Sequence, residues 1–291
     1  MKNFIDKISN EKNISFVKMQ GCGNDFIIID YDKKLENKNL SELAIKLCNR
    51  NFGIGADGLI INHSSKIADF RMQIINSDGS EPEMCGNGIR CFARYLEILE
   101  KTDKKDLKIE TLAGIIKPKL VKKDNFTLVE VDMGNPILEA DKIPVAKFSS
   151  EKVINENLVV DNQNFNFTAV SMGNPHCIIY VDDFKNLDFE KWGPKIEAFT
   201  EVFPKKVNVE FVTVDNEDNL SVKVWERGAG PTLACGTGAC AVLVSSVLNN
   251  KSKRKANVHL PGGTLNIEWK DDNTIIMTGP AEVSFYGAFE L

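Results

Sequence analysis

Two cysteines in this sequence begin the same short motif, Cys-Gly-x-Gly. Cys85 begins CGNG at residues 85–88, and Cys235 begins CGTG at residues 235–238, 150 positions later (235 − 85). A free thiol with a pKa of about 8.5 is only a few per cent thiolate at neutral pH, so a reactive cysteine needs help from its surroundings. Glycines at a helix start let backbone N–H groups approach a ligand closely, and those groups stabilise a carboxylate or a thiolate together with the helix dipole. Both motifs therefore predict a cysteine at the N-terminus of a helix, beside a site for an anion.

The offset of 150 residues recurs elsewhere in the chain, which indicates an old duplication. It places residues 23–24 (Gly-Asn) on residues 173–174 (Gly-Asn), and Asn76 on Glu226. Because two related halves each carry one cysteine just before a predicted helix, they predict one acid and one base that face a single substrate.

Two cysteines can serve three classes of chemistry. A redox pair attacks and resolves a disulfide, but such pairs usually lie close together in sequence. A cysteine hydrolase needs a histidine and an orienting partner, and His176 could be that base, yet the second matching cysteine would then be unexplained. In racemisation or epimerisation a thiolate removes a proton from a carbon, and a thiol on the opposite face returns one. Only this third scheme requires two equivalent thiols, so the sequence favours it.

The elements that must position these motifs alternate between strands and helices. Apolar runs and alternation predict strands within residues 16–30, 69–76 and 106–132, and the spacing of apolar residues predicts a helix that Ser41 caps. Residues 89–99 and 239–248 read as helices that are apolar on nearly all sides, and such helices are buried.

These elements predict an α/β (α+β) protein with two pseudo-symmetric domains, each a curled, mostly antiparallel or mixed β-sheet around a buried central helix. The predicted domains are an N-terminal extension over residues 1–15, a half carrying Cys85 over residues 16–133 plus about 280–291, and a half carrying Cys235 over residues 134–279.

Composition excludes several other classes. The 291 residues are 43% hydrophobic and 26% charged, which is typical of a globular protein, and the net charge of −5 argues against a nucleic-acid partner. No apolar run reaches the length of a bilayer span, and the first 15 residues lack a secretion signal. The seven cysteines are an odd number without a Cys-x-x-Cys pair, and the three histidines lie far apart. We therefore expect a cytoplasmic protein with no metal and no membrane partner.

The motifs together resemble those of the diaminopimelate epimerase family. The matching stretches span nearly the whole chain after residue 15: GCGNDF (21–26), NSDGS (76–80), MCGNGIRC (84–91), MGNPHC (172–177), WERGAG (225–230) and ACGTGAC (234–240). Proline racemase and phenazine-type isomerases share that fold but not this set of motifs. The resemblance implies an isomerase that interconverts LL- and meso-diaminopimelate without a cofactor, in lysine and peptidoglycan precursor synthesis, as a homodimer.

The resemblance also implies a role for each matching residue. Cys85 would accept the proton and Cys235 would donate it in the LL-to-meso direction, with the roles exchanged in reverse, and His176 and Glu226 would tune the two thiols. The substrate ligands would be Asn76, Asn174, Asn208, Glu226 and Arg227 at the distal amino acid head, Asn24 as the first binding asparagine, and Gly86, Asn87, Gly236 and Thr237 around the reacting carboxylate.

The chain departs from some family members at Gly58, where a glutamine binds substrate, and we carry no role to that position. Three other functions stay open: an epimerase of another amino acid, a thiol-dependent hydrolase or redox protein, and a non-catalytic binding module. Deuterium incorporation at the α-carbon in heavy water separates an epimerase from the others.

Overall fold

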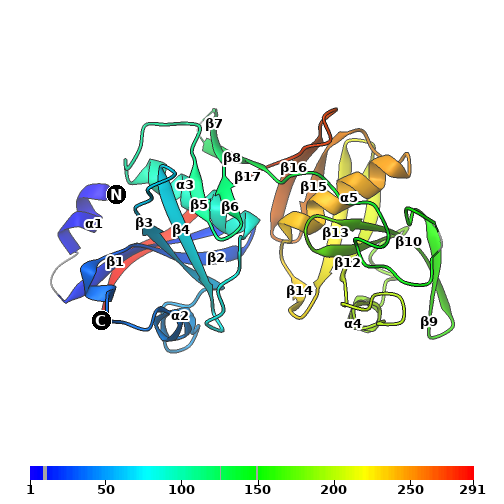
Figure 1. Cartoon of the computed structure of the whole chain (residues 1–291), viewed down its shortest axis with the longest axis horizontal. Coiled ribbons are helices and arrows are strands. Elements are labelled where there is room, and N and C mark those ends of the chain that lie inside the picture. The colour runs from blue at the N-terminus through cyan, green and yellow to red at the C-terminus, as the bar shows by residue number, and fades with distance from the viewer. Residues whose placement is uncertain (9–11, 125, 149) are drawn as a thin grey trace. The chain divides into compact units, whose positions relative to one another are not determined.

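The structure is a computed structural model that describes residues 1–8, 12–124, 126–148 and 150–291. The chain divides into two compact units, Met1–Val131 with Gly279–Leu291, and Asp132–Thr278 (Figure 1). Each unit combines a β-sheet with helices, so the predicted mixed α+β class is confirmed. The predicted domain limits, residues 16–133 plus about 280–291 and residues 134–279, stay a prediction.

The described sheet of the first unit has the strand order β18-β1-β2-β3-β4-β5-β6. Strands β2 and β3, and strands β4 and β5, pair in parallel, and the other neighbours are antiparallel. The elements of this unit are α1 (Lys2–Ile8), β1 (Asn13–Gly21), β2 (Asn24–Asp30), a 3-10 turn (Lys33–Leu35), α2 (Leu40–Cys48), β3 (Gly58–His63), β4 (Phe70–Asn76), α3 (Gly86–Ile98), β5 (Ile109–Thr111), β6 (Gly114–Ile116), the hairpin of β7 (Lys119–Lys123) and β8 (Phe126–Asp132), and β18 (Glu282–Glu290).

The strands of the second unit follow the order β17-β16-β15-β13-β12-β11-β10-β9, with β14 paired to β13. Strand β11 pairs with β12, and β13 with β15, in parallel. The elements are β9 (Glu156–Val160), β10 (Gln163–Ser171), β11 (Pro175–Tyr180), α4 (Phe189–Glu197), β12 (Asn208–Asn216), β13 (Asn219–Glu226), β14 (Gly230–Thr232), α5 (Gly236–Leu248), β15 (Lys255–Leu260), β16 (Gly263–Trp269) and β17 (Ile275–Gly279).

One long helix lies in the core of each unit, as the sequence predicts. Helix α3 packs on β1, β2 and β4, and Ile89, Phe92 and Leu96 on it have no exposed surface. Helix α5 packs on β10, β11, β12 and β16 (Figure 1), and every residue from 239 to 246 is buried. Because burial of apolar surface is the main driving force of folding, these helices fix where their N-termini can lie.

The predicted cap at Ser41 is wrong: Asn39 caps α2, and its Oδ1 accepts hydrogen bonds from the backbone N–H groups of Ser41 and Glu42 at 3.1 and 3.3 Å. The Ser41 hydroxyl instead donates to the carbonyl of Gly79 at 2.5 Å. The predicted extension, residues 1–15, contains α1, which contacts β1 and β18 of its own unit.

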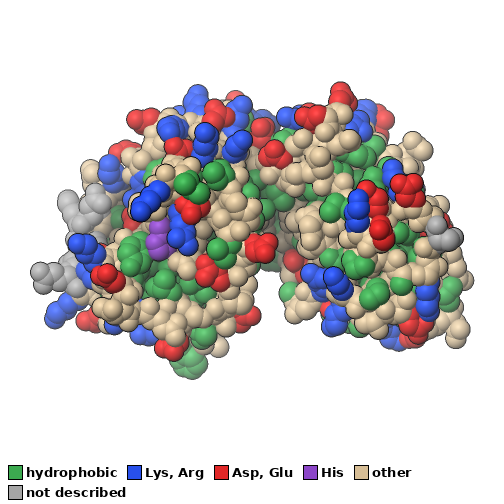
Figure 2. All heavy atoms as spheres, viewed as in Figure 1, with side chains coloured by type: hydrophobic (Ala, Val, Ile, Leu, Met, Phe, Trp, Pro, Cys, Tyr) green, Lys and Arg blue, Asp and Glu red, His purple; other side chains and the backbone are tan. Residues whose placement is uncertain are grey.

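Positive and negative side chains are interspersed on the visible face of each unit (Figure 2). In the part of the chain that the structure describes, we find no helix with the length and apolar character of a membrane span.

Candidate active site

Both motif cysteines occupy the same local position, the N-cap of a helix. Cys85 precedes α3 with φ −137° and ψ 120°, and Cys235 precedes α5 with φ −120° and ψ 112°. Each sulfur accepts the backbone N–H three residues on, from Gly88 at 3.4 Å and from Gly238 at 3.3 Å. The helices begin at once after the cysteines, earlier than the apolar pattern alone predicts. Each sulfur therefore lies at the positive end of a helix dipole, where a negative charge is stabilised.

In the first unit, Asn24 connects Cys85 to a carboxylate. The Asn24 Oδ1 accepts from the Cys85 sulfur at 3.7 Å and from the Asn87 amide at 3.1 Å, while its Nδ2 donates to Asp57 Oδ2 at 2.6 Å. Asn24 begins β2 and Asp57 directly precedes β3, and these parallel strands place the two residues side by side. The predicted binding residues Asn24 and Asn87 thus lie beside the first cysteine.

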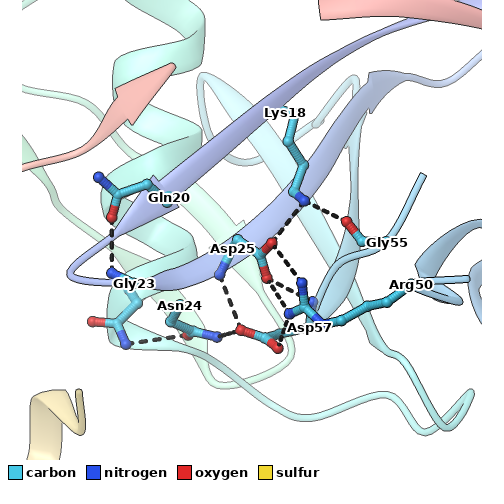
Figure 3. Close-up of polar contacts among 9 residues, drawn as sticks. Lys18, Gln20, Gly23, Asn24, Asp25, Arg50, Gly55 and Asp57 are labelled. Carbon is cyan, nitrogen blue, oxygen red and sulfur yellow. Dashed lines mark hydrogen bonds and ion pairs between the residues drawn. The ribbon is translucent and has the colours of Figure 1, made fainter. Parts of the chain in front are cut away.

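Asp57 belongs to an ionic cluster of Lys18, Asp25, Arg50 and Asp57 at the base of this half-site (Figure 3). Arg50 binds Asp25 at 2.7 Å and Asp57 at 2.8 Å, and the buried Lys18 ammonium binds Asp25 at 2.6 Å. Each aspartate also donates its backbone N–H to the carboxylate of the other, from Asp25 to Asp57 Oδ2 at 3.0 Å and from Asp57 to Asp25 Oδ1 at 3.1 Å. Burial alone would raise the pKa of Asp25, but the bonds from Arg50 and Lys18 lower it to about 2. This cluster fixes the Asp57 carboxylate that holds Asn24.

The cluster gives a prediction for stability. Asp25→Asn should lower the free energy of unfolding at pH 7 by about 2 kcal/mol, because it removes a carboxylate whose pKa is depressed in the folded state. The wild-type advantage is complete above about pH 4, the usual value for aspartate, and is lost as the pH falls toward 2. Urea unfolding at pH 7, 4 and 3 measures it, and a difference that stays constant down to pH 3 would contradict the assignment.

Gly58 and Asn76 lie at the same edge, opposite each other in the β3–β4 pair. A side chain on Gly58 would begin 3.0 Å from the carbonyl oxygen of Ile75, so this backbone leaves little room for a larger residue at this position. The Asn76 amide donates to the Ser80 hydroxyl at 3.0 Å, which ties down the loop that leads to Cys85. The predicted ligand Asn76 therefore lies at the end of β4, opposite Gly58 and one strand beyond β3.

In the second unit, a chain of hydrogen bonds leads from Cys235 to a buried carboxylate. The Cys235 sulfur lies 3.4 Å from Thr237 Oγ1, which accepts the Asn174 amide at 3.2 Å. The Asn174 Oδ1 lies 3.0 Å from His176 Nε2, and His176 Nδ1 lies 2.7 Å from Glu210 Oε1. Neither His176 nor Glu210 has any exposed surface. The predicted residues Asn174, His176 and Thr237 thus meet at the second cysteine, with Glu210 added.

Glu226 also belongs to the surroundings of Cys235. Burial raises the pKa of the Cys235 thiol well above its usual value, and the negative charges of Glu226 and Glu210 raise it further, while bonds from Thr237 and the Gly238 N–H lower it only in part. Burial likewise raises the pKa of Glu226, against a 2.6 Å hydrogen bond from Thr232. Burial and two carboxylates therefore outweigh the helix N-terminus, and Cys235 holds its proton at neutral pH.

The contrast between the two cysteines predicts unequal reactivity. Cys235 is 5% exposed, whereas Cys85 is half-buried, and thiolate character with access controls alkylation. With one equivalent of iodoacetamide at pH 8, we expect Cys85 to react at least about ten times faster than Cys235. Peptide mass spectrometry reads the labelled sites, and denatured protein provides the control. Equal labelling of Cys85 and Cys235 in the folded protein would contradict this assignment.

Asn208 and Arg227 lie at the start of β12 and just after β13. The buried Asn208 side chain donates to the Pro175 carbonyl at 2.8 Å and accepts from the Arg227 N–H at 2.9 Å, so it holds the backbone beside the exposed Arg227 guanidinium. Glu197 supports the next residue, because its Oε1 accepts the Gly228 N–H at 3.0 Å. These contacts present the arginine side chain at the end of β13.

Three charged residues were missed by the reasoning from sequence. Asp57 has no motif of its own, and Arg90 lies inside a helix whose neighbours are apolar, yet it is fully buried and donates to the Gly86 carbonyl at 3.1 Å. Glu210 did carry a signal: it interrupts the apolar run NVEFVTV at residues 208–214, and a lone charge in a buried strand needs a partner.

The fold is shared with known proteins of low sequence identity. A phenazine biosynthesis protein of the PhzF family from Bacillus anthracis matches with a TM-score of 0.71 at 17% identity, covering 96% of this chain and 100% of that one. A hydroxyproline epimerase from Agrobacterium vitis matches with a TM-score of 0.67 at 12% identity, covering 97% and 93%. These likenesses show that this chain has the same fold as a PhzF-family protein and a hydroxyproline epimerase.

Sequence comparison shows the family. The diaminopimelate epimerase family model matches residues 16–139 and 168–284. The diaminopimelate epimerase of Desulfitobacterium hafniense is 54% identical over 94% of this chain and 97% of its own length, and that of Carboxydothermus hydrogenoformans is 52% identical over 96% and 100%. The chloroplastic enzyme of Oryza sativa subsp. japonica is 49% identical over 98% and 82%. The chain belongs to the diaminopimelate epimerase family, a family of isomerases.

Proposed function

We propose that this chain interconverts LL- and meso-diaminopimelate, with Cys85 and Cys235 as the two groups that move the α-proton. The observation that carries the proposal is the matched N-cap position of both sulfurs, one in each unit, each bonded to the N–H of the third residue of its helix. Relatives that share about half of their residues with this chain bear the name of this enzyme, and they match over nearly its whole length.

The charges around each sulfur support different roles for the two cysteines. Cys235 faces two carboxylates and keeps its proton, so it is the donor in the LL-to-meso direction. Helix α3 carries the buried cation Arg90 one turn after Cys85, at a position where the 150-residue offset places Cys240 in the second half. The positive end of α3 favours a negative sulfur at Cys85, whereas Glu226 and Glu210 crowd Cys235, so we assign Cys85 as the acceptor. Microscopic reversibility exchanges the roles in the reverse direction.

The α-proton of an amino acid is very weakly acidic, so the protein must stabilise the carbanion that its removal creates. We assign this task to backbone N–H groups at the two helix N-termini, at Gly86 and Asn87 in α3 and at Gly236 and Thr237 in α5. Donors fixed in advance around the reacting carboxylate stabilise the developing charge without reorganisation. The reaction then needs no group beyond those of the chain.

Substrate specificity is proposed to come from the residues that bind the distal amino acid head of the substrate, the one that does not react. Arg227 can bind a carboxylate with two parallel hydrogen bonds, and Glu226 can accept an ammonium group. Asn76, Asn174 and Asn208 complete this set as amide donors and acceptors. Such a site favours a substrate with two amino acid heads over an ordinary amino acid.

We further propose that the protein is a homodimer in the cytoplasm, as the family resemblance implies. Light scattering during gel filtration measures the molar mass, and a mass near the 32.4 kDa of one chain would contradict the dimer.

The experiment that tests the function is the conversion of LL-diaminopimelate in heavy water. An epimerase forms the meso isomer with deuterium at the inverted α-carbon, because the thiol that donates has exchanged with the solvent. A hydrolase or a redox protein leaves the substrate unlabelled. Absence of both inversion and label would reject the proposed function.

A further inference from the structure

Glu210 is a buried carboxylate that no family motif explains. It lies in β12 with no exposed surface, and its Oε1 contacts His176 Nδ1 at 2.7 Å. Its Oε2 is also buried and accepts no hydrogen bond from the described residues. A Cβ on Gly238 would lie 2.7 Å from Oε1, so the helix that carries Cys235 fits closely against this carboxylate. Because burial of a charge is costly unless a partner compensates it, Glu210 requires a cation.

The groups bonded to the His176 ring point to this side chain as the cation. A carboxylate only accepts hydrogen bonds, so Glu210 requires a proton on Nδ1. The amide of Asn174 donates to Thr237 with its nitrogen, so its oxygen faces His176 and requires a proton on Nε2. This pattern of two acceptors fits a ring with a proton on each nitrogen, whose positive charge would neutralise Glu210.

This arrangement sets the direction of the whole hydrogen-bond chain. Thr237 Oγ1 accepts from Asn174, so the hydroxyl proton is available to the Cys235 sulfur 3.4 Å away. If His176 were neutral with its proton on Nδ1, its Nε2 would accept, and the Asn174 amide would turn over. Thr237 would then donate to Asn174 and could only accept from the S–H group of Cys235. The first direction stabilises a thiolate, and the second stabilises a thiol.

We propose that Glu210 is a positioning residue that keeps His176 protonated on both ring nitrogens, so that Thr237 donates to the Cys235 thiolate formed during the reaction. The inference rests on the proposed function, in which the S–H bond of Cys235 breaks and its proton joins the electron pair of the substrate carbanion. The negative charge stays on the sulfur, where the Thr237 hydroxyl meets it. Glu210 touches neither the substrate nor the sulfur, and acts through His176.

Other titratable groups lie beside this chain of hydrogen bonds, and their titration would contribute to any pH profile of the activity. Glu226 on β13 interacts with Glu210, His176 and Cys235. Cys177 on β11 is fully buried, and burial and then the charge of Glu210 raise the pKa of its thiol well above the usual value. Cys235 itself caps α5. A measurement on the His176 ring avoids the overlap of these titrations.

The test observes the ring nitrogens directly. The chain has three histidines, so uniform 15N labelling of histidine gives three ring spin systems, which His63→Gln and His259→Gln variants assign. In the wild-type protein at pH 7.5 we expect His176 to be protonated on both nitrogens. In Glu210→Gln we expect a neutral ring with the proton on Nδ1. Because one indirect donor to the thiolate is lost, kcat should fall about 10- to 100-fold with KM within about twofold.

A matched control is Glu197→Gln, which removes another buried carboxylate of the same unit. Among the described residues, Glu197 bonds to Lys206, Trp225 and Gly228, and not to any residue of the hydrogen-bond chain from Glu210 to Cys235. This variant should leave the His176 ring doubly protonated. A neutral His176 ring in active wild-type protein would overturn the inference even if Glu210→Gln failed to fold, and so would a Glu210→Gln variant with unchanged kcat. Wild-type protein that neither inverts nor labels diaminopimelate would instead overturn the proposed function.

Discussion

Replacement of either Cys85 or Cys235 by serine should lower the rate of epimerisation by at least about 1,000-fold. A serine hydroxyl fits the N-cap position, so the helix N-terminus and the fold are retained. It is a far weaker acid than a thiol, so serine can neither act as the base at neutral pH nor return a proton readily. Chiral chromatography of diaminopimelate after timed incubation measures the loss for each variant.

Cys91→Ala provides the matched control, because Cys91 is a fully buried cysteine in the interior of α3. It should keep most of the activity, with only a loss of stability from the smaller side chain. Circular dichroism at 222 nm and thermal unfolding show that each serine variant is folded. Retention of one tenth of the wild-type rate by Cys85→Ser or Cys235→Ser would remove that residue from the proposed proton transfer.

Lysine should be a substrate at least about 10,000 times poorer than diaminopimelate in kcat/KM. Lysine lacks only the distal carboxylate, so it would leave the Arg227 guanidinium and nearby amides without their partner. A site built around hydrogen bonds to a missing group rejects the analogue strongly, because the polar groups that the bound ligand shields from water stay unpaired. Deuterium incorporation into L-lysine in heavy water, measured by mass spectrometry, gives this rate with high sensitivity.

Arg227→Leu tests whether the arginine carries that selectivity. The variant should lose activity on diaminopimelate by about 100-fold or more, because a charge-assisted pair is removed, while its activity on lysine should change little. The ratio of kcat/KM for diaminopimelate to kcat/KM for lysine should therefore fall. An unchanged ratio would assign the selectivity to other residues, and turnover of lysine by the wild-type protein at a comparable rate would contradict the assigned distal site.

The local features of this fold could be predicted well from sequence. The apolar faces of the two long helices identify the buried centre of each unit, and the Cys-Gly-x-Gly motifs mark their N-termini. The offset of 150 residues places Asn24 and Asn174 in equivalent positions. In the structure Asn24 bonds to the Cys85 sulfur, and Asn174 bonds to Thr237, which contacts the Cys235 sulfur. These predictions succeed because they depend on short-range patterns and on burial.

The charged supports of the site could not be predicted in the same way. Asp25 and Asp57 meet because β2 and β3 pair in parallel, and no sequence spacing encodes that register. Lys18 comes from β1 and Arg50 from the segment after α2, so the cluster also needs the β1–β2 pairing and the end of that helix. Glu210 reaches His176 through the parallel pairing of β11 and β12. The helix cap was also not predictable, because asparagine and serine cap helices about equally well and propensity alone cannot choose between Asn39 and Ser41. In the structure Asn39 is the cap.

The central claim is that one thiol works on each face of the same carbon, and proton exchange by single variants tests it most directly. In heavy water, Cys235→Ser keeps the Cys85 thiolate, so it should remove the α-proton of LL-diaminopimelate and return deuterium to the same face. Cys85→Ser keeps Cys235 and should label the inverted centre of meso-diaminopimelate in the same way. The predicted result is that each variant labels one isomer only, Cys235→Ser the LL form and Cys85→Ser the meso form, and that neither variant inverts the α-carbon. Equal labelling of both isomers by one variant, or labelling of the opposite isomer, would contradict the two-thiol account.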